Sequence, residues 1–286
     1  MTRRILAACV LWSVTIAACG SPSGPGPVTP PPPPPPANAL PIIESIKVTG
    51  RRARQPANFA DLSETVDVVA AVHDDETPLT DLEFQWTASV GRFEGSGASV
   101  AWIAPSSAPA PVEVALTLKL VEKYGQPGGP KIYQHDVSSS ANVSLHDSAK
   151  EVGDMAKQFL LDFSDSRITN ISEIMRNFQP GCYGTQDETD QVTENRRRFV
   201  ILDSRVNEPV TTIAFGGTCP YQRRPGDACS GVSVFWKSMD LVVNATREDA
   251  GTDWLAAFYY PDQHRWRLCD SSFEGQRVGV GRPFMR

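Results

Sequence analysis

The chain has 286 residues, of which 41% are hydrophobic and 21% are charged, and its formal net charge is −6 at neutral pH. This length is sufficient for two domains of ordinary size. Nucleic-acid phosphates require a basic protein face, and the longest basic run here is the arginine triplet at 196–198. The composition therefore predicts a folded protein that does not bind nucleic acid, and the charge balance identifies no other class of partner.

The first residues have the features of an export signal. Two arginines precede an apolar run over 5–16, which is too short to span a hydrocarbon core of about 30 Å. The sequence Ile-Ala-Ala-Cys at 16–19 resembles the lipobox of bacterial lipoproteins. This resemblance implies a signal peptide over 1–18, cleavage after Ala18, and attachment of acyl chains such as palmitate to Cys19. The alternative is an ordinary secretory peptide, which leaves that cysteine as an odd thiol.

The segment over 19–41 is predicted to be the lipid-bearing cysteine followed by a proline-rich linker. Seven consecutive prolines at 30–36 favour an extended polyproline II conformation. At about 3.1 Å per residue, such a tether reaches roughly 60 Å. A ligand for SH3 or WW domains is the less favoured interpretation. Gly20 stands where enterobacterial lipoproteins retained in the inner membrane have aspartate, so we expect an anchor in the outer membrane, at the cell surface or the periplasmic face.

Four cysteines remain after the leader and the predicted anchor are set aside, and all lie between residues 182 and 269. An even number in one region of an exported chain predicts two disulfides. Cys219 and Cys229 flank a polar loop that a local bridge would close, and Cys182 would then pair with Cys269. The spacings typical of zinc sites are absent, so metal binding is the less favoured interpretation.

Between residues 42 and 146 the hydrophobic pattern has a period of two. Apolar side chains occupy alternate positions over 66–72, 82–86 and 112–120, and turn-forming sequences separate these segments. About seven short strands in about a hundred residues are typical of a β-sandwich. We therefore predict an all-β sandwich over 42–146.

Three features of this segment resemble the bacterial Ig-like and PKD-like modules of surface proteins. They are Trp86, the glycine-rich hairpin at 91–97, and Trp-Ile-Ala-Pro at 102–105. The resemblance implies an Ig-like sandwich. The chain lacks a cysteine pair between the sheets and the Trp-Asp-Phe-Gly-Asp-Gly motif of PKD modules, so no recognition function is carried over with the fold.

The loop at 73–76, His-Asp-Asp-Glu, holds the carboxylate cluster of this segment. Calcium takes several oxygen ligands, and three carboxylates could supply some of them. The Asp-x-Asp-x-Asp-Gly spacing of calcium loops is absent. The favoured interpretation is a solvated turn whose aspartates cap backbone amides.

From residue 147 to residue 286 the pattern predicts helices followed by strands. Apolar residues at helical spacing over 148–163 predict an amphipathic helix, and Ser148 and Glu151 have the spacing of a capping box. Further helices are predicted over 168–178 and 186–198. The predicted strands are 200–206, 210–215, 232–243, 254–260 and 265–272. Helices followed by a curved antiparallel sheet predict an α+β cone.

This order of elements resembles the NTF2-like, or SnoaL-like, superfamily. The resemblance is also carried by Ala-Lys-Gln-Phe-Leu-Leu-Asp-Phe at 156–163 and Trp-Arg-Leu-Cys at 266–269. Such folds include isomerases, dehydratases and non-catalytic interaction modules, so the fold does not specify the function. In the enzymes an aspartate, a histidine and a tyrosine line the cone, and none of these positions is assigned here.

Motifs for nucleophilic, zinc-dependent and phosphate chemistry are absent from the sequence. His264 lies in a predicted turn and is interpreted as a solvated residue rather than a base. Asp270 either faces the cone or pairs with Arg265 or Arg267. An aromatic binding surface is possible, although strand aromatics more often pack in a core. The aromatic residues concerned are Trp236, Trp254, Tyr259, Tyr260 and Trp266. We assign no catalytic residue, cofactor or metal ligand.

Two functions are compatible with these features. The favoured one is a lipoprotein that acts as a non-catalytic binding or assembly module, in which the sandwich is a stalk and the cone binds a protein or a small molecule. The alternative is an anchored enzyme of the NTF2-like type, of an isomerase, dehydratase or hydrolase kind, which uses a carboxylate or a tyrosine in the cone. A buried acid that faces an open cavity would favour the enzyme.

Overall fold

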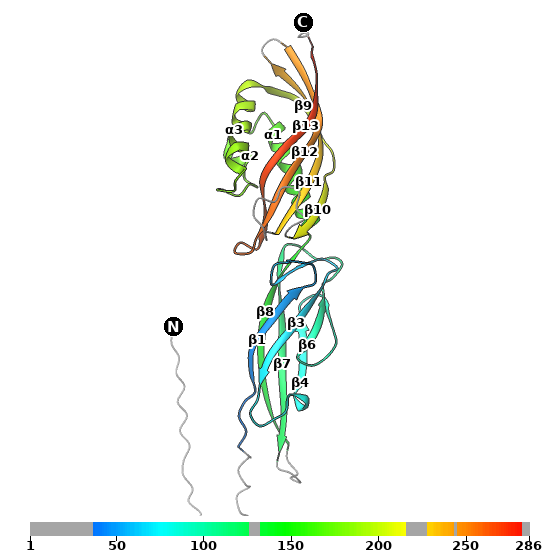
Figure 1. Cartoon of the computed structure of the whole chain (residues 1–286), viewed down its shortest axis with the longest axis vertical. Helices are drawn as coiled ribbons and strands as arrows, with labels where there is room; N and C mark the ends of the chain where they lie inside the picture. The colour runs from blue at the N-terminus through cyan, green and yellow to red at the C-terminus, as the bar shows by residue number, and fades with distance from the viewer. Residues whose placement is uncertain (1–36, 126–131, 216–227, 243–244, 282–286) are drawn as a thin grey trace, which may run out of the picture. The chain divides into compact units, whose positions relative to one another are not determined.

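Strands make up most of the fold, and a few helices accompany them (Figure 1). The structure is a computed structural model that describes residues 37–125, 132–215, 228–242 and 245–281. The predicted signal peptide, Cys19 and most of the predicted linker lie outside these residues. Residues 37–286 belong to one compact unit.

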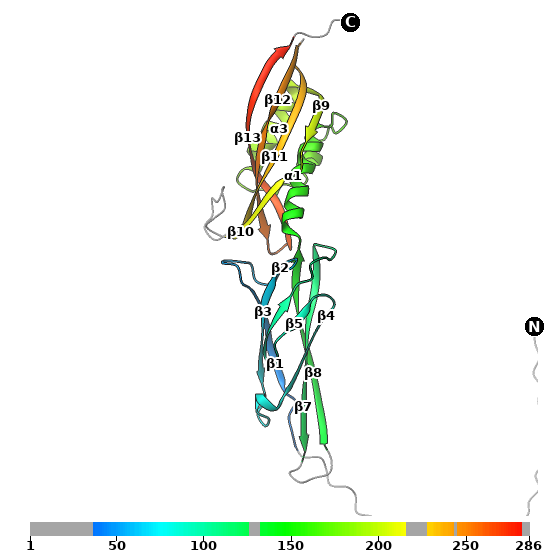
Figure 2. The ribbon, with the colours of Figure 1, turned by 90° about the vertical axis from the view of Figure 1, so that its right-hand side faces the viewer.

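The first part of the described chain is a β-sandwich of two four-stranded sheets (Figure 2). One sheet has the order β1-β3-β6-β5, and the other has the order β2-β8-β7-β4. All neighbouring strands are antiparallel except β2 and β8. The strands are β1 (Ile42–Gly50), β2 (Phe59–Asp61), β3 (Thr65–His73), β4 (Glu83–Ala88), β5 (Arg92–Glu94), β6 (Ser99–Ile103), β7 (Val112–Gly125) and β8 (Ile132–His146), with a short 3-10 helix η1 (Leu79–Asp81).

The alternation of apolar residues determines which face of each strand is buried. Val66 and Val68 of β3 are buried, as are Leu116 and Leu118 of β7. The inward faces of the two sheets therefore form a hydrophobic core, as the period of two predicts. Trp102 is fully buried in this core.

The hairpin at 91–97 is closed by a tryptophan side chain. The indole Nε1 of Trp102 donates a hydrogen bond to the carbonyl of Val90 at 3.2 Å. Gly91 has a φ of +76°, and a Cβ at this residue would lie 2.7 Å from the same Nε1 atom. Only glycine suits this position, because it needs both a left-handed backbone and a close approach to the ring.

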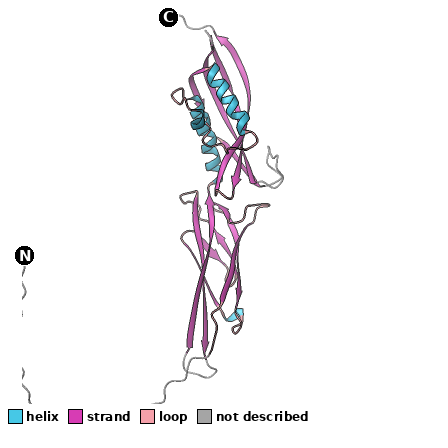
Figure 3. Ribbon diagram, turned by 90° about the vertical axis from the view of Figure 1, so that its left-hand side faces the viewer, coloured by secondary structure: helices cyan, strands magenta, loops and turns pink. Residues whose placement is uncertain are grey.

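The second part combines three helices with a curled antiparallel sheet, and the helices cover one face of this sheet (Figure 3). Strands β10, β11, β12 and β13 are adjacent in this order, and β9 pairs with the other half of β11. The elements are α1 (Ser148–Ser164), α2 (Ile171–Ile174), α3 (Thr185–Arg198), β9 (Val200–Val206), β10 (Val210–Phe215), β11 (Ala228–Val242), β12 (Ala245–Tyr260) and β13 (Arg265–Gly281). The predicted order of helices and then strands is confirmed.

Helix α1 is the predicted amphipathic helix, but it begins differently from the prediction. Asp147 is the N-cap, and its side chain accepts a hydrogen bond from the backbone amide of Lys150. Glu151 accepts one from the amide of Asp147 at 3.0 Å. The predicted capping box with Ser148 as the cap was therefore wrong by one residue, because Ser148 Oγ instead accepts a buried hydrogen bond from the indole of Trp266.

The predicted helix over 168–178 is much shorter in the structure. Helix α2 is a single turn, which Asn170 caps through a hydrogen bond to the amide of Ser172. The chain then leaves the helix and exchanges backbone hydrogen bonds with Leu268 of β13. This pairing satisfies the peptide groups at 177 and 179, which helix formation would otherwise have to satisfy.

Three of the five C-terminal strands are longer than their hydrophobic patterns predict. Strands β9 and β10 have the predicted bounds, whereas β11, β12 and β13 continue into polar sequence. The first half of β12, residues 246–253, is paired with β11 on one side and β13 on the other. Polar residues in this half of the strand form much of the site described below.

Strand β13 contains a bulge, where Cys269 is an extra residue opposite the neighbouring strand. A bulge changes which side chains point to each face of the sheet beyond it. Leu268 is buried in the core, whereas Ser271 and Phe273 line a pocket on the same side of the sheet.

One residue of the sandwich lies in the core of the second part. Phe59 of β2 is fully buried and belongs to the same hydrophobic cluster as Tyr259 and Trp266. Its ring centroid lies 4.8 Å from that of Tyr259 and 5.5 Å from that of Phe215. Phe59 thus extends from the sandwich into the hydrophobic core of the second part, while the sandwich keeps a separate core of its own.

The predicted disulfide between Cys182 and Cys269 is present, with a Cα–Cα distance of 5.5 Å. The second predicted pair lies outside the described residues, because Cys219 is not among them and the side chain of Cys229 is not described. Within the described ranges, no helix is long and apolar enough to cross a membrane.

Candidate functional site

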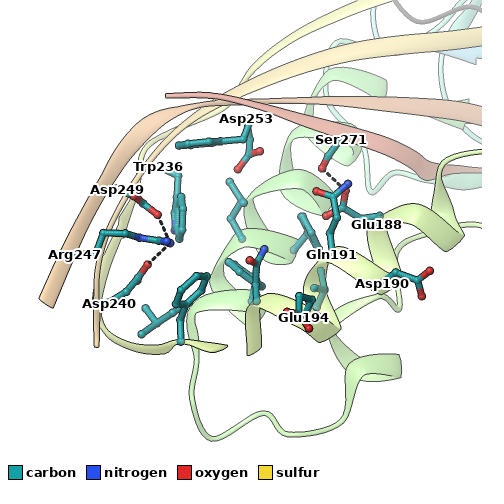
Figure 4. Close-up of a pocket in the computed structure, with 18 residues that line it drawn as sticks. Glu188, Asp190, Gln191, Glu194, Trp236, Asp240, Arg247, Asp249, Asp253 and Ser271 are labelled. Atoms are coloured by element: carbon teal, nitrogen blue, oxygen red, sulfur yellow. Dashed lines mark hydrogen bonds and ion pairs between the residues drawn. The ribbon is translucent and has the colours of Figure 1, made fainter. Parts of the chain in front are cut away.

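The second part contains a pocket of about 610 Å³ between the helices and the concave face of the sheet (Figure 4). Helices α1 and α3 form one side, and strands β9, β11, β12 and β13 form the other. Its lining residues are Phe159, Leu160, Phe163, Glu188, Asp190, Gln191, Val192, Glu194, Asn195, Phe199, Ile201, Trp236, Asp240, Arg247, Asp249, Asp253, Ser271 and Phe273.

Much of the pocket wall is aromatic. Helix α1 contributes Phe159 and Phe163 from successive turns, and these rings lie 6.5 Å apart. Trp236 of β11 packs against Phe163 at 5.8 Å and against Phe273 of β13 at 5.9 Å between ring centroids. Such a wall offers an apolar molecule a large area of contact.

One end of the pocket holds a buried ionic cluster from β11 and β12. Arg247 forms ion pairs with Asp240, at 3.1 Å, and with Asp249. Its guanidinium carbon lies 4.0 Å from the ring centroid of Phe199, which is a cation–π geometry. Burial raises the pKa of Asp240. Two carboxylates and one aromatic face therefore surround Arg247, while its Nε atom is buried without a hydrogen-bond partner among the described residues.

A second pair of acids lies farther along the same pocket. Glu188 of α3 is only 6% exposed and accepts a hydrogen bond from the hydroxyl of Ser271. Asp253 of β12 is only 7% exposed, and its carboxyl group points into the pocket (Figure 4). Among the described residues, neither acid forms an ion pair with a lysine or an arginine.

The environment of these two acids favours their neutral forms. Burial and, to a lesser extent, the neighbouring carboxyl of Glu188 together raise the pKa of Asp253 to about 7. Burial also raises the pKa of Glu188, and its hydrogen bond from Ser271 partly opposes this. A carboxyl group whose pKa is near neutrality can either release a proton to a partner or accept one.

The β-strand repeat and the helical repeat explain why these side chains converge. Arg247, Asp249 and Asp253 are separated by even numbers of residues on β12, so they share one face of the strand. Glu188 and Asn195 are seven residues apart on α3, so they share one face of that helix. The pocket is the volume between these two faces.

The candidate residues that the sequence singled out lie elsewhere. His264 lies in the turn between β12 and β13 with a φ of 51°, and its Nδ1 is 3.0 Å from a carboxylate oxygen of Glu113. Asp270 lies against Gly184 at the start of α3, where a Cβ on the glycine would be 2.5 Å from the carboxyl carbon. Neither residue lines the pocket.

The five aromatic residues do not form a common exposed surface. Tyr259 and Trp266 are buried in the core, and Trp236 is buried in the pocket wall. Trp254 is 37% exposed and is not part of the pocket lining, whereas Tyr260 packs against a separate small cluster. Core packing, the common role of strand aromatics, is therefore the role of most of them.

The loop at 73–76 is a capped turn. Asp74 accepts hydrogen bonds from the backbone amides of Glu76 and Thr77, and His73 forms an ion pair with Asp75. In the parts of the chain that the structure describes, no three His, Cys, Asp or Glu side chains are arranged to hold a metal ion.

The sequence contained a signal for the pocket acids. Between 246 and 253, Arg247, Asp249 and Asp253 are at even spacing, which is compatible with one face of a strand, although Glu248 interrupts the alternation. Apolar alternation alone does not detect such a strand, and a charged inner face indicates a functional cavity rather than a packed core.

No model of a known protein family matches the sequence, and no curated protein matches it significantly. The chemistry of the pocket's own side chains is therefore the basis for assigning a function.

Proposed function

We propose that this protein is a lipid-anchored bacterial protein that binds a small organic molecule in the pocket of its C-terminal part. In this proposal an Ig-like or PKD-like sandwich over 42–146 is the stalk, and an NTF2-like cone over 147–286 is the binding head. Acyl chains on Cys19 anchor the protein in the outer membrane, at the cell surface or the periplasmic face.

The observation that carries the proposal is the pocket itself. Its volume of about 610 Å³ lies within the range of about 300–1,000 Å³ that is usual for small-molecule sites. An aromatic wall with a few buried polar groups is also usual for such sites. A molecule of this size would displace water from the rings of Trp236 and Phe163 and contact the buried acids of the same lining.

The test is a thermal-shift screen of the purified full-length protein against neutral, cationic and anionic small molecules. We expect at least one class to raise the melting temperature saturably. The variant Asn195→Trp places a large ring in the pocket from α3 and should abolish the shift. Thr193→Trp is the matched control, because residue 193 is an exposed position of the same helix that does not line the pocket.

Absence of any saturable shift, or an equal shift in wild type and Asn195→Trp, would reject the pocket as a binding site. An equal loss of binding in both tryptophan variants would also reject it, because the effect would then come from the helix rather than from the cavity.

Asp253 supports a second candidate function, an enzyme that transfers protons in the pocket. A buried carboxyl group with a pKa of about 7 is suited to act as a general acid or base. Incubation of the wild-type protein with each molecule that binds, followed by mass spectrometry, would detect a product. If the protein is an enzyme, Asp253→Asn should lose conversion even at ligand concentrations that saturate it, and unchanged ligand with wild type would leave the binding function alone.

A further inference from the structure

We propose that the pocket selects an organic cation: a protonated amine of the ligand pairs with Asp253 and Glu188, and its apolar body lies against the rings of Trp236 and Phe273. This inference rests on the proposed function, because it names the chemical class of molecule that the same pocket takes. Four features of the pocket support this preference for a cation.

The first feature is the charge of the lining. Six carboxylic acids line the pocket, whereas Arg247 is its single basic residue. Asp190 and Glu194 are exposed and have partners on α3 itself. The remaining four acids are buried, so most of the negative charge lies inside the pocket, where the attraction for a cation is less screened by water.

The second feature is the division of the buried acids into two pairs. Asp240 and Asp249 share the positive charge of Arg247, although one carboxylate oxygen of each is buried without a hydrogen-bond partner among the described residues. Glu188 and Asp253 have no such partner among the described residues, and Glu188 accepts only the hydroxyl hydrogen bond of Ser271. One pair of acids therefore has its cation and the other pair lacks one.

The third feature is the position of Asp253. This side chain is 93% buried, forms no hydrogen bond or ion pair with any described residue, and points into the cavity (Figure 4). An isolated buried carboxylate is costly unless a charged partner compensates it. A ligand ammonium group in the cavity would be that partner.

The fourth feature is found by comparison within the pocket. Arg247 is an organic cation that lies between carboxylates and beside the ring of Phe199 at 4.0 Å. The same pocket lining also combines two carboxylates that lack a basic partner, those of Glu188 and Asp253, with the rings of Trp236 and Phe273. Aromatic faces attract organic cations, whereas calcium takes six to eight oxygen ligands. The pocket therefore suits an amine with an aromatic or branched aliphatic body.

The experiment compares three probes of similar shape on the purified full-length protein at pH 8. Phenethylamine carries a positive charge, phenethyl alcohol is neutral, and phenylacetate is negative. At this pH the amine is protonated and Asp253, with a pKa of about 7, is largely ionised. We expect titration calorimetry to give a dissociation constant for the amine at least tenfold lower than for the alcohol, and no binding of the anion.

Variants then locate the preference. Asp253→Asn should bring the dissociation constants of the amine and the alcohol to within about twofold of each other, because it removes the unpaired carboxylate. Asp187→Asn removes the same charge from an exposed position of α3 outside the pocket lining and should keep the preference for the amine above about fivefold, since solvent screens that position. Circular dichroism and the melting temperature of each variant check that it is folded.

Each outcome decides between the two proposals. Equal affinity for the amine and the alcohol would overturn the cation preference and leave the small-molecule site standing. Binding of none of the three probes, together with neutral or anionic hits in the thermal-shift screen, would overturn it in the same way. Failure of these probes and of the entire screen would reject the proposed function as well. An equal effect of Asp253→Asn and Asp187→Asn would assign the preference to net charge and reject the pairing with Asp253.

Discussion

The carboxyl group of Asp253 lies where an apolar side chain would stabilise the fold better. Burial raises its pKa to about 7, above the ordinary 3.8. Between about pH 4 and pH 7 the folded protein therefore keeps a proton that the unfolded chain has already released. The native state is therefore favoured at low pH, and this advantage is lost as the pH rises through 7. A shift of this size corresponds to about 4 kcal/mol as an upper limit.

Asp253→Asn should raise the free energy of unfolding at pH 8 by about 1–3 kcal/mol, because asparagine is buried without a charge. At pH 5 the same substitution should have a smaller effect, because the loss of stability begins near the ordinary pKa of 3.8 and is complete only above the native pKa of about 7. Urea denaturation of both proteins at the two pH values measures the difference. Asp190→Asn, at an exposed position, is the control. Equal effects of Asp253→Asn at pH 5 and pH 8 would contradict the raised pKa.

At the scale of elements, helix α1 depends on its N-terminal hydrogen bonds. Asp147, the residue before the helix, accepts a hydrogen bond from the amide of Lys150. Asp61 of the sandwich accepts one from the amide of Ser148 at 3.0 Å. Asp147→Ala should lower the free energy of unfolding by about 1 kcal/mol, whereas Asp147→Asn should restore most of it. Thermal denaturation of the three proteins would show this order, and a loss of equal size in both variants would indicate that charge rather than capping is responsible.

The disulfide joins the loop before α3 to the bulge of β13. Cys182 and Cys269 are 87 residues apart, and the chain-entropy model gives a loop of this size about 4–5 kcal/mol of stabilisation. Replacing both cysteines by alanine should lower the free energy of unfolding by up to this amount, as measured by urea denaturation. A stability unaffected by the double substitution would contradict a structural role. Peptide mapping without reductant tests the predicted bond between Cys219 and Cys229 in the same preparation.

The elements that sequence reasoning predicted well are those whose hydrophobic pattern has one clear period. Helix α1 and strands β9 and β10 appear where apolar spacing placed them. The first half of β12 has few apolar residues, and its strand structure comes from pairing with both neighbours rather than from local preference. The pocket also depends on tertiary structure, because Asp253 and Arg247 converge with Glu188 only when the sheet curls against α3. The bulge in β13 also changes which of its side chains point to each face of the sheet, and the spacing of residues in the sequence does not predict this change.

At the scale of the whole molecule, the sandwich contributes Phe59 to the hydrophobic core of the second part. Phe59→Ala should lower the free energy of unfolding by about 3–5 kcal/mol and increase hydrogen exchange in β12 and β13 as well as in the sandwich. Phe93→Ala, a change of the same chemistry within the sandwich core, should not increase exchange in those C-terminal strands. Exchange that rises only in the sandwich after Phe59→Ala would contradict the placement of Phe59 in the core of the second part.

The predicted anchor is tested by cell fractionation. Wild type should be recovered in the membrane fraction, and Cys19→Ala should be recovered in the soluble fraction, because acyl chains supply the membrane affinity. Cys9→Ala, a substitution in the predicted leader, should remain in the membrane fraction. Recovery of Cys19→Ala in the membrane fraction would reject the acyl anchor.

The position of Phe59 limits how this architecture can be rearranged. The strand β8 ends at His146 and helix α1 begins at Ser148, so the two parts are joined by a single residue. A different sandwich grafted at this junction would leave a hole of the size of a benzyl group beside Tyr259 and Trp266, unless it also brought an aromatic side chain to the same place. An exchange of the sandwich therefore requires a matching change in the core of the second part.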